Sequence, residues 1–404
     1  MNGIEELSRK SQPKFIQVHF LTSWAGALLN RDETGSAKRL PFGAAMRTRI
    51  SSQCLKRHWR MTEDSRGLRQ LAEQHGVAGE RTKLAIERVV IGPLQDRYPE
   101  TMLRPVQEAF LRRYYGSKSA DLRQRQSLLF GRPEIEFMQK AAELILSQAT
   151  APNHAETLAD QWMKDERANL TALIHTSQPS AGLEAALFGR MVTSDIRANM
   201  DAAIHVAHAF TVHAEQPELD FFSVVDDLAS RSEADVETAG LFDTELTTGL
   251  FYGYVVIDVP LLVSNLTGCS RREWADDQDR GLAAQVVENL IWLIAEVSPG
   301  AKKGATAPYG RAEMVLVEAG DRQPRTLANA FREPVLFTDG SGQTFGRRAA
   351  HALQGHLTAL DELYSTGEAR CHMATPEMQL GNIKNVPLRE LASWAGTRVL
   401  HAAL

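Results

Sequence analysis

The segment from residue 30 to residue 60 constrains this 404-residue chain more than any other stretch. It carries eight basic residues against two acidic ones, a net charge of about +6, in a chain whose formal net charge is −5. Its first half mixes glycine, serine and alanine with arginine and lysine, a composition typical of a surface loop. A solvated surface is the usual explanation of such a charge run. This loop, however, leads directly into a predicted helix. A basic loop followed by a helix start favours a site that binds an anion over a merely solvated surface.

The predicted helix extends from Ser51 to about Met61. Ser51 or Ser52 can cap it by accepting hydrogen bonds from the amides of its first turn. The same amides, together with the helix dipole, can bind an anion. Leu55 and Trp59 are four residues apart and form a stripe that should face the core. The opposite face is therefore left for solvent or a ligand.

Basic side chains occupy the face of this helix that lies opposite the apolar stripe. Lys56 and Arg60 are four residues apart, and Arg57 lies beside them. We expect a phosphate to meet the helix start and these side chains together, and a continuous polyanion fits the whole segment better than a small phosphate ester. The residues predicted to contact it are Ser51, Ser52, Lys56 and Arg57 of the helix and Arg31, Lys38, Arg39, Arg47 and Arg49 of the loop.

Composition narrows the class of protein. A chain of 404 residues is expected to form two or three modules, and 43% hydrophobic with 24% charged residues is ordinary for a soluble globular protein. No apolar run approaches the roughly 20 residues that span a bilayer, and the N-terminus shows no apolar signal core. The three cysteines are far apart and predict neither a disulfide framework nor a zinc site. We therefore expect a cytoplasmic protein, with no membrane association, no metal and no cofactor.

Hydrophobic periodicity indicates the elements of the first half. Alternation over residues 14–22 predicts a strand, in which His19 is expected to be structural. Residues 62–180 are rich in Ala, Leu, Glu, Gln and Arg and predict a helical insertion. Within it, residues 97–132 hold eight basic and three acidic residues. This charge fits a second nucleic-acid surface and a solvated helix face equally well.

The second half predicts a hairpin followed by further helices and strands. Residues 215–245 contain ten acidic residues and one arginine between two strand-like segments, which indicates a long hairpin with a loose tip. The elements expected after it are a helix over 276–297, a loop around Lys302 and Lys303, a strand over 314–318, and helices starting at 327 and at about 347. This order fits an α+β core that favours antiparallel strands.

Several motifs, taken in order along the chain, resemble one known family. They are LLNRD at 28–32, RTRISSQCLKRHWR at 47–60, GRMVTS at 189–194, HVAHAFTVHA at 205–214, DFFSVVDDL at 220–228, TGLFYGYVVID at 248–258, EVSPGAKKGATAPYGRAEMVLVE at 296–318 and LANAFREPV at 327–335. In this order they resemble the backbone subunit of type I-E CRISPR Cascade complexes, the CasC family. The resemblance extends over nearly the whole chain and is weakest over 62–180 and after 340.

The resemblance implies an α+β fold shaped like a right hand. An RRM-like (ferredoxin-like) palm would carry an inserted helical fingers domain and a thumb β-hairpin. In this sequence the first part of the palm, with the basic loop, would be residues 1–61. The fingers would be residues 62–181. The second part of the palm would be residues 182–404, with the thumb at about 215–250.

The resemblance also implies a non-catalytic, CRISPR RNA-binding backbone subunit of a type I-E Cascade ribonucleoprotein. Copies would polymerise head to tail along the guide RNA and present it for pairing with target DNA in antiviral defence. A subunit that contacts only the RNA backbone can bind guides of any sequence, because base pairing between guide and target recognises the target. The implied partners are CRISPR RNA, the target strand, other copies of the chain, and the large, small, guide-processing and end-capping subunits.

Matched motifs assign further residues by resemblance. Lys302 and Lys303 match a second basic loop of the family. Met191, in GRM, falls where the family places an apolar side chain against a displaced base, although packing in the core is the ordinary explanation of such a methionine. The stretch after 194 looks shorter than the family pattern. In the acidic thumb, the apolar residues expected to act as a wedge are Phe221, Phe222 and Val225.

A rival interpretation is an enzyme. Relatives with this palm in other CRISPR classes cleave target RNA with an aspartate in the loop after the first strand, and Asp32 lies in that loop. Asp32 has cations around it and no evident second metal ligand. His205 and His208 are three residues apart, so a strand would place them on opposite faces, which argues against a metal site that also includes His213. A third interpretation, a helical scaffold that binds no RNA, leaves the cationic loop unexplained.

Overall fold

The computed structural model describes residues 13–165, 182–192, 199–224, 240–276 and 278–400. The strands of its main sheet are β1 (Phe15–Ala27), β2 (Arg39–Phe42), β3 (Ala45–Ile50), β6 (Ile204–Val206), β7 (Ala209–Thr211), β8 (Pro217–Val224), β9 (Gly240–Asp258), β10 (Ala312–Gly320) and β11 (Ala369–Ala374). Their order is β11-β10-β1-β9-β7-β3-β2, and β6 and β8 also pair with β9. All these pairings are antiparallel, which makes the described fold a mixed α+β architecture around an antiparallel sheet.

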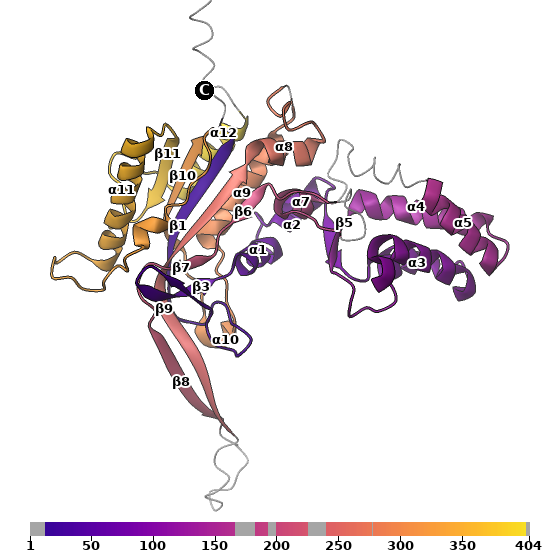
Figure 1. The fold of residues 1–404 in the computed structure, drawn as a ribbon, viewed down its shortest axis with the longest axis horizontal. Helices are drawn as coiled ribbons and strands as arrows, with labels where there is room; N and C mark the ends of the chain where they lie inside the picture. Colours follow the sequence, from indigo (N-terminus) through magenta and orange to yellow (C-terminus); the bar gives the residue numbers. More distant parts are fainter. Residues whose placement is uncertain (1–12, 166–181, 193–198, 225–239, 277, 401–404) are drawn as a thin grey trace, which may run out of the picture.

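β1 is an interior strand of this sheet and lies between β10 and β9 (Figure 1). It pairs with β10 on one side and β9 on the other, so that Val18 lies opposite both Val317 and Val255. The predicted strand is therefore confirmed, and Val18 is fully buried in the main hydrophobic cluster. His19 points to the other face and is also fully buried. Both faces of β1 are buried because helices cover the sheet on both sides.

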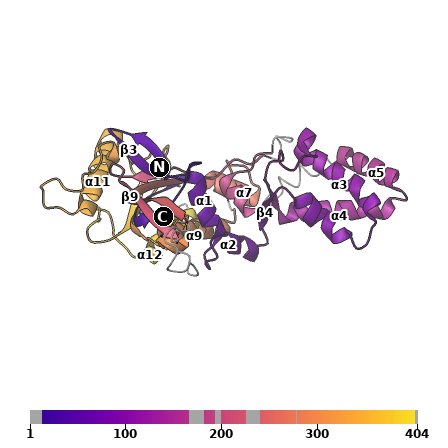
Figure 2. The ribbon, with the colours of Figure 1, turned by 90° about the horizontal axis from the view of Figure 1, so that it is seen from below.

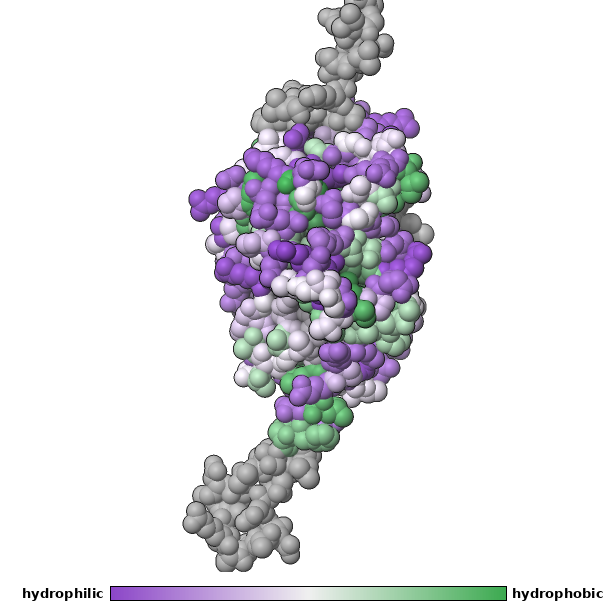
Figure 3. All heavy atoms as spheres, turned by 90° about the vertical axis from the view of Figure 1, so that its left-hand side faces the viewer, coloured by the Kyte–Doolittle hydropathy of each residue, from purple (hydrophilic) through white to green (hydrophobic). Residues whose placement is uncertain are grey.

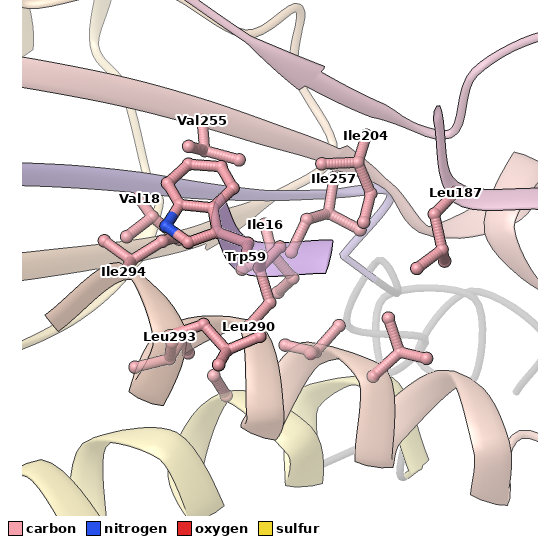
Figure 4. Packing of buried hydrophobic residues seen from close by; sticks show 14 of the residues in the cluster. Ile16, Val18, Trp59, Leu187, Ile204, Val255, Ile257, Leu290, Leu293 and Ile294 are labelled. Atoms are coloured by element: carbon pink, nitrogen blue, oxygen red, sulfur yellow. The ribbon is translucent and has the colours of Figure 1, made fainter. Parts of the chain in front are cut away.

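One face of the sheet is covered by four helices: α1 (Ser52–Met61), α8 (Val259–Thr267), α9 (Gly281–Glu296) and α12 (Leu388–Leu400). Figure 4 shows Trp59 of α1 and Leu290 of α9 close to Val18 and Val255 of the sheet. The helix predicted over 276–297 is confirmed, although it begins at Gly281.

The other face is covered by α11 (Phe345–Tyr364) and the short 3-10 helix η6 (Ala328–Phe331). Phe331 and Leu353 of these helices are fully buried together with Leu316 of β10. The helices predicted to begin at 327 and about 347 correspond to these two elements. No helix in the described part of the chain combines the length and apolar character needed to span a bilayer.

The helical insertion has a hydrophobic cluster of its own, which includes Phe110 and Met138. Its elements are the π-helix η2 (Ala85–Ile91), α3 (Glu100–Tyr115), α4 (Arg132–Gln148) and α5 (Pro152–Asp165). Figures 1 and 2 show α3, α4 and α5 side by side at one end of the molecule, away from the main sheet. By contrast α2 (Leu68–Gln74), which lies in the same predicted insertion, packs into the main cluster through Leu68 and Leu71. The rest of the predicted insertion, from residue 166, lies outside the described residues.

A two-stranded sheet that the sequence did not predict joins the insertion to the rest of the chain. It consists of β4 (Gly79–Thr82) and β5 (Leu128–Gly131). Beside it, the N–H of Leu183, the first residue of α7 (Leu183–Phe188), donates to the carbonyl oxygen of Val77 at 2.7 Å. The chain therefore enters and leaves the insertion at one hydrogen-bonded joint.

The predicted hairpin is confirmed in its described part. β8 pairs with the first half of β9 from Pro217 opposite Thr247 to Val224 opposite Gly240, and the hairpin projects from the sheet (Figure 1). Its second arm begins at Gly240, inside the acidic segment, and continues without interruption into the sheet. In the space-filling view the described end of the hairpin carries hydrophobic residues beside hydrophilic ones (Figure 3).

A buried polar network links β1 to the layer around α11. His19 Nδ1 lies 2.9 Å from the Tyr252 hydroxyl, and its Nε2 lies 3.0 Å from Glu318 Oε2. Arg325 and Arg370 each donate to the Glu318 carboxylate at 2.6 Å. Burial alone would raise the pKa of Glu318, but hydrogen bonds from Arg325 and His19 outweigh it and hold that pKa well below its usual range. His19 is therefore structural, as predicted.

The buried histidines predict that the protein is less stable in mild acid. Burial lowers the pKa of His19, His213 and His372 in the folded state, whereas in the unfolded chain these groups titrate near 6.5. The unfolded state therefore binds more protons as the pH falls below about 6.5, and stability decreases with it. We expect the urea midpoint to fall steadily from about pH 7.5 to about pH 5. A midpoint that stays constant or rises over this range would contradict the prediction.

Candidate nucleic-acid interface

Helix α1 is built largely as the sequence predicts, with Ser51 as its N-cap. The Ser51 hydroxyl accepts a hydrogen bond from the Cys54 N–H at 3.2 Å, and the core stripe is buried. Protein acceptors already occupy two further amides at this end. The Ser51 N–H donates to Asn30 Oδ1 at 2.9 Å, and the Ser52 N–H donates to His208 Nδ1 at 3.1 Å. An anion at this position must therefore be held mainly by side chains rather than by these amides.

Three of the predicted cations surround His208 at the start of α1. They are Lys38, Arg49 and Lys56, and we call them the cationic cluster. Burial lowers the pKa of His208, and the charges of these three residues lower it further. The Arg49 guanidinium lies 3.5 Å from His208 Nδ1 and donates through Nε to the carbonyl oxygen of Arg39 at 3.1 Å. The structure thus brings together residues from three separate parts of the chain.

Arg81 of β4 is a neighbour of this cluster that sequence reasoning missed. Partial burial lowers the pKa of Lys56, and the nearby charge of Arg81 lowers it further. The carboxylate of Glu184 also lies near Arg81 and forms an ion pair of 3.4 Å with Arg60, so the protein itself supplies part of the negative charge on this side of α1. Nothing in the composition of residues 79–82 signals this role, because it depends on where β4 is placed against α1.

The two predicted basic loops meet beside α1. The Ala301 N–H donates to the carbonyl oxygen of Leu28 at 2.8 Å, which joins the loop of Lys302 and Lys303 to the loop of Arg31. A hollow lies between them, with Cys54 and His58 of α1 in its wall. Burial lowers the pKa of His58, and the charges of Lys303 and Arg57 reinforce this. Arg57 and Lys303 are exposed near His58, whereas the charged residues that line the hollow itself are Arg31, Asp32 and Glu33.

The prediction that Arg47 contacts a ligand is wrong, because its side chain is fully buried. Its guanidinium donates to the carbonyl oxygens of Thr211 at 3.1 Å and Phe331 at 2.8 Å. It also reaches the Phe42 carbonyl oxygen at 3.4 Å. Arg47 therefore ties β3 to β7 and to the end of η6, and it serves the core rather than a surface.

Arg39 and Lys302, two predicted ligand contacts, are engaged by the hairpin. Arg39 Nε donates to Glu215 at 2.5 Å, and its Nη2 donates to Glu245, so it bridges both arms at the base. Lys302 Nζ donates to the Thr244 hydroxyl and lies 5.6 Å from the centroid of the Phe222 ring. These cations hold the hairpin in place. The expectation that the acidic residues face solvent or a neighbouring protein is wrong for Glu245, which is buried.

The apolar residues singled out in the sequence are exposed where the structure describes them. Met191 is 63% exposed, so core packing does not explain it. Phe221 is 70% exposed and Phe222 is 42% exposed, both on β8. Val225 lies outside the described residues.

The basic stretch 97–132 is largely paired within the insertion. At least five of its eight cations form ion pairs with carboxylates. The pairs are Arg97 with Glu143, Arg104 with Glu108, Arg112 with Asp160, Arg125 with Glu87, and Arg132 with Glu136. This pairing favours a solvated helix face over a second nucleic-acid surface.

Asp32 is tethered within its own loop. Its Oδ1 accepts hydrogen bonds from the Thr34 N–H at 2.9 Å, the Thr34 hydroxyl at 2.8 Å and the Ser36 N–H at 3.0 Å. The hydrogen bond from the Thr34 side chain is the main reason that the pKa of Asp32 is lowered. Among the described residues, no three or more His, Cys, Asp or Glu side chains are grouped so that they could hold a metal ion.

Comparison with known proteins shows similarity over most of the chain. A family model described as CT1975-like protein matches residues 16–394. No curated protein matches the sequence. A chain from a structure titled "CRISPR RNA-guided surveillance complex, pre-nicking" is similar with a TM-score of 0.72 at 22% identity, covering 95% of this chain and all of that chain. A second, titled "CRISPR RNA-guided surveillance complex", has a TM-score of 0.63 at 18% identity, covering 95% and 99%. At these identities the two chains show a shared fold.

The burial of Arg47 predicts a loss of stability when it is replaced. Arg47→Met keeps the volume but leaves buried carbonyl oxygens without their donors, which costs about 2 kcal/mol. We expect a lower urea midpoint at an unchanged slope of free energy against urea. Arg57→Ala is the matched control, since an exposed arginine changes stability by no more than about 0.5 kcal/mol. Equal midpoints for the two variants would contradict the structural role of Arg47.

Proposed function

This chain belongs to the CT1975-like protein family, and on that premise we propose that it is an RNA-binding backbone subunit of a type I-E Cascade surveillance complex. The observation that carries the proposal is the meeting of two basic loops and the cationic cluster around α1. This surface matches what gripping an RNA backbone requires. The fold shared with chains of CRISPR RNA-guided surveillance complexes supports the same assignment.

The strand order supports an RRM-like palm. Along the chain come β1, α1, β6, β9, α9 and β10, and in the sheet the four strands lie in the order β10-β1-β9-β6. This is a βαββαβ arrangement with two covering helices on one face, as in ferredoxin-like folds. We assign the insertion as fingers and the projecting hairpin of β8 and β9 as a thumb.

The proposed binding is to phosphates and carries no base readout. Lys38, Arg49 and Lys56 would hold the backbone at the start of α1, and Arg57 and Lys303 would hold it near His58. Contacts to phosphate fix the position of a strand without reading its sequence, which a subunit that serves many guides requires. Base pairing would then read the target DNA strand.

The proposed assembly is head to tail along the guide. The exposed apolar residues of the hairpin, Leu219 and Phe221, lie on the same face of β8, because side chains two apart on a strand share a face. In the assembly they would contact the RNA segment held by the next copy, and Met191 would stand against a displaced base. The further partners would be the large, small, guide-processing and end-capping subunits, in antiviral defence in the cytoplasm.

We propose that the subunit does not cleave RNA. The supporting observation is that the Asp32 carboxylate already accepts three hydrogen bonds inside its loop. Metal-assisted cleavage needs carboxylates or equivalent ligands that converge on a phosphate. A ribonuclease that uses Asp32 with a metal ion is the alternative.

The salt dependence of RNA binding tests the proposed interface. Affinity should fall steeply with salt and be nearly independent of RNA sequence. Lys56→Ala and Arg57→Ala should each reduce the slope of log K against log salt by roughly 0.7 for each lost phosphate contact on a single strand. The slopes are measured by titrating single-stranded RNAs of unrelated sequence at several salt concentrations.

Arg104→Ala is the control for this experiment, since the exposed Arg104 is already paired with Glu108 within the insertion. It should leave the salt slope close to that of the wild type. If Lys56→Ala and Arg57→Ala also leave the slope unchanged, these residues do not belong to the site.

Whether the paired target strand is cut distinguishes the proposed scaffold from the alternative ribonuclease. The assembled complex is incubated with complementary RNA or single-stranded DNA in the presence of Mg²⁺ or Mn²⁺. We expect pairing without scission, and only a small change in RNA affinity for Asp32→Ala, because that variant loses a loop tether. Cuts at regular spacing that disappear in Asp32→Ala would establish the ribonuclease instead.

A further inference from the structure

Met191 is exposed between two buried neighbours. Its own side chain is 63% exposed, whereas Arg190 is 5% exposed and Val192 is 1% exposed. In extended chain successive side chains point to opposite sides. Burying residues 190 and 192 therefore turns residue 191 outward.

On its buried side this segment forms an ion pair with the insertion, between Arg190 and Glu134. Arg190 Nη1 donates to Glu134 Oε2 at 2.7 Å, and Nη2 donates to Glu134 Oε1 at 3.0 Å, which makes a bidentate pair. The two side chains are 1% and 0% exposed. The Tyr114 hydroxyl donates to Glu134 Oε1 at 2.8 Å, and Arg190 lies 5.6 Å from the centroid of the Phe130 ring. The Arg190–Glu134 pair is therefore held by residues of α4, β5 and α3.

The backbone on both sides of Met191 is held as well. Arg190 and Met200 exchange two backbone hydrogen bonds of 2.9 Å each. Gln126 Nε2 donates to the carbonyl oxygen of Met191 at 3.0 Å, and the Val192 N–H donates to Asn199 Oδ1 at 2.6 Å. The exposed thioether thus stands on a backbone fixed at residues 190, 191 and 192.

We propose that Glu134, Arg190 and Gln126 are positioning residues that hold Met191 at a fixed place against the RNA. The inference rests on the proposed function, in which Met191 stands against a displaced base. It adds that the helical insertion sets the position of this side chain. A bidentate guanidinium–carboxylate pair fixes orientation as well as distance, and an apolar wedge must be held rigidly if it is to unstack a base rather than swing away from it.

The test uses RNA that carries 2-aminopurine, whose fluorescence rises when it is unstacked. The probe is moved one position at a time along an RNA on which the full-length chain is assembled. Wild-type protein should give a fluorescence maximum at the displaced position, and Met191→Ala should lose it. Glu134→Gln and Gln126→Ala should lose most of the same maximum while RNA affinity and salt slope stay at wild-type values.

Two further variants control for indirect effects. Glu136→Gln removes an exposed ion pair with Arg132 on the same helix and should keep the maximum. Gln126 is exposed, so its replacement leaves the fold intact and decides the question if Glu134→Gln fails to fold. A structural role alone would lower thermal stability and RNA affinity together, without a selective loss at one probe position.

The outcomes separate this inference from the function on which it rests. If Met191→Ala loses the maximum but both Glu134→Gln and Gln126→Ala keep it, the positioning role is overturned and the wedge stands. If Met191→Ala keeps the maximum, the proposed role of Met191 is overturned, and the inference fails with it. Loss of the maximum in all three variants, at unchanged affinity, supports the proposal.

Discussion

The antiparallel pairing of β9 with β1 runs from Asp258 opposite Phe15 to Thr247 opposite Ala27, and from Thr247 onward the same strand pairs with β8. Hydrogen bonds therefore continue from the buried centre of the sheet into the projecting hairpin. A hairpin attached through a loop could change its direction, whereas one that continues a central strand takes its direction from the sheet. Arg39 of β2 and Lys302 of a loop farther along the chain then hold the hairpin through Glu245 and Thr244.

The distribution of carboxylates decides which cations of the basic segment can serve a ligand. Arg47 is fully buried and donates to carbonyl oxygens, so it contributes nothing to the surface. Arg39 meets two glutamates at the base of the hairpin. Lys38 and Lys56 are instead gathered around a histidine whose pKa their charges help to lower. The local charge at this surface is therefore less than the count of arginines and lysines suggests, but it is concentrated at the start of α1.

Elements whose hydrophobic residues recur at regular spacing could be predicted from the sequence. Elements that form only against a partner distant in the sequence could not. β1 and α1 follow from alternation and from the Leu55–Trp59 stripe, both of which are local signals. β4 has only four residues, GERT, without alternation, and it forms because β5 lies beside it. Arg47 and Arg49 are the same residue type two positions apart. They differ because Arg47 is buried against the carbonyl oxygens of Thr211 and Phe331, which are distant in the sequence. Residue type and spacing thus predicted the cationic surface but not which of its members the core would use.

The joint at Val77 and Leu183 has an evolutionary consequence. Because the chain enters and leaves the insertion at one hydrogen-bonded place, the helices beyond it can diverge or change in length while the sheet keeps its pairing. Glu134, however, lies among these helices and accepts a hydrogen bond from Arg190, which lies outside the insertion. A change in these helices therefore also changes the contacts of Arg190, the residue next to Met191.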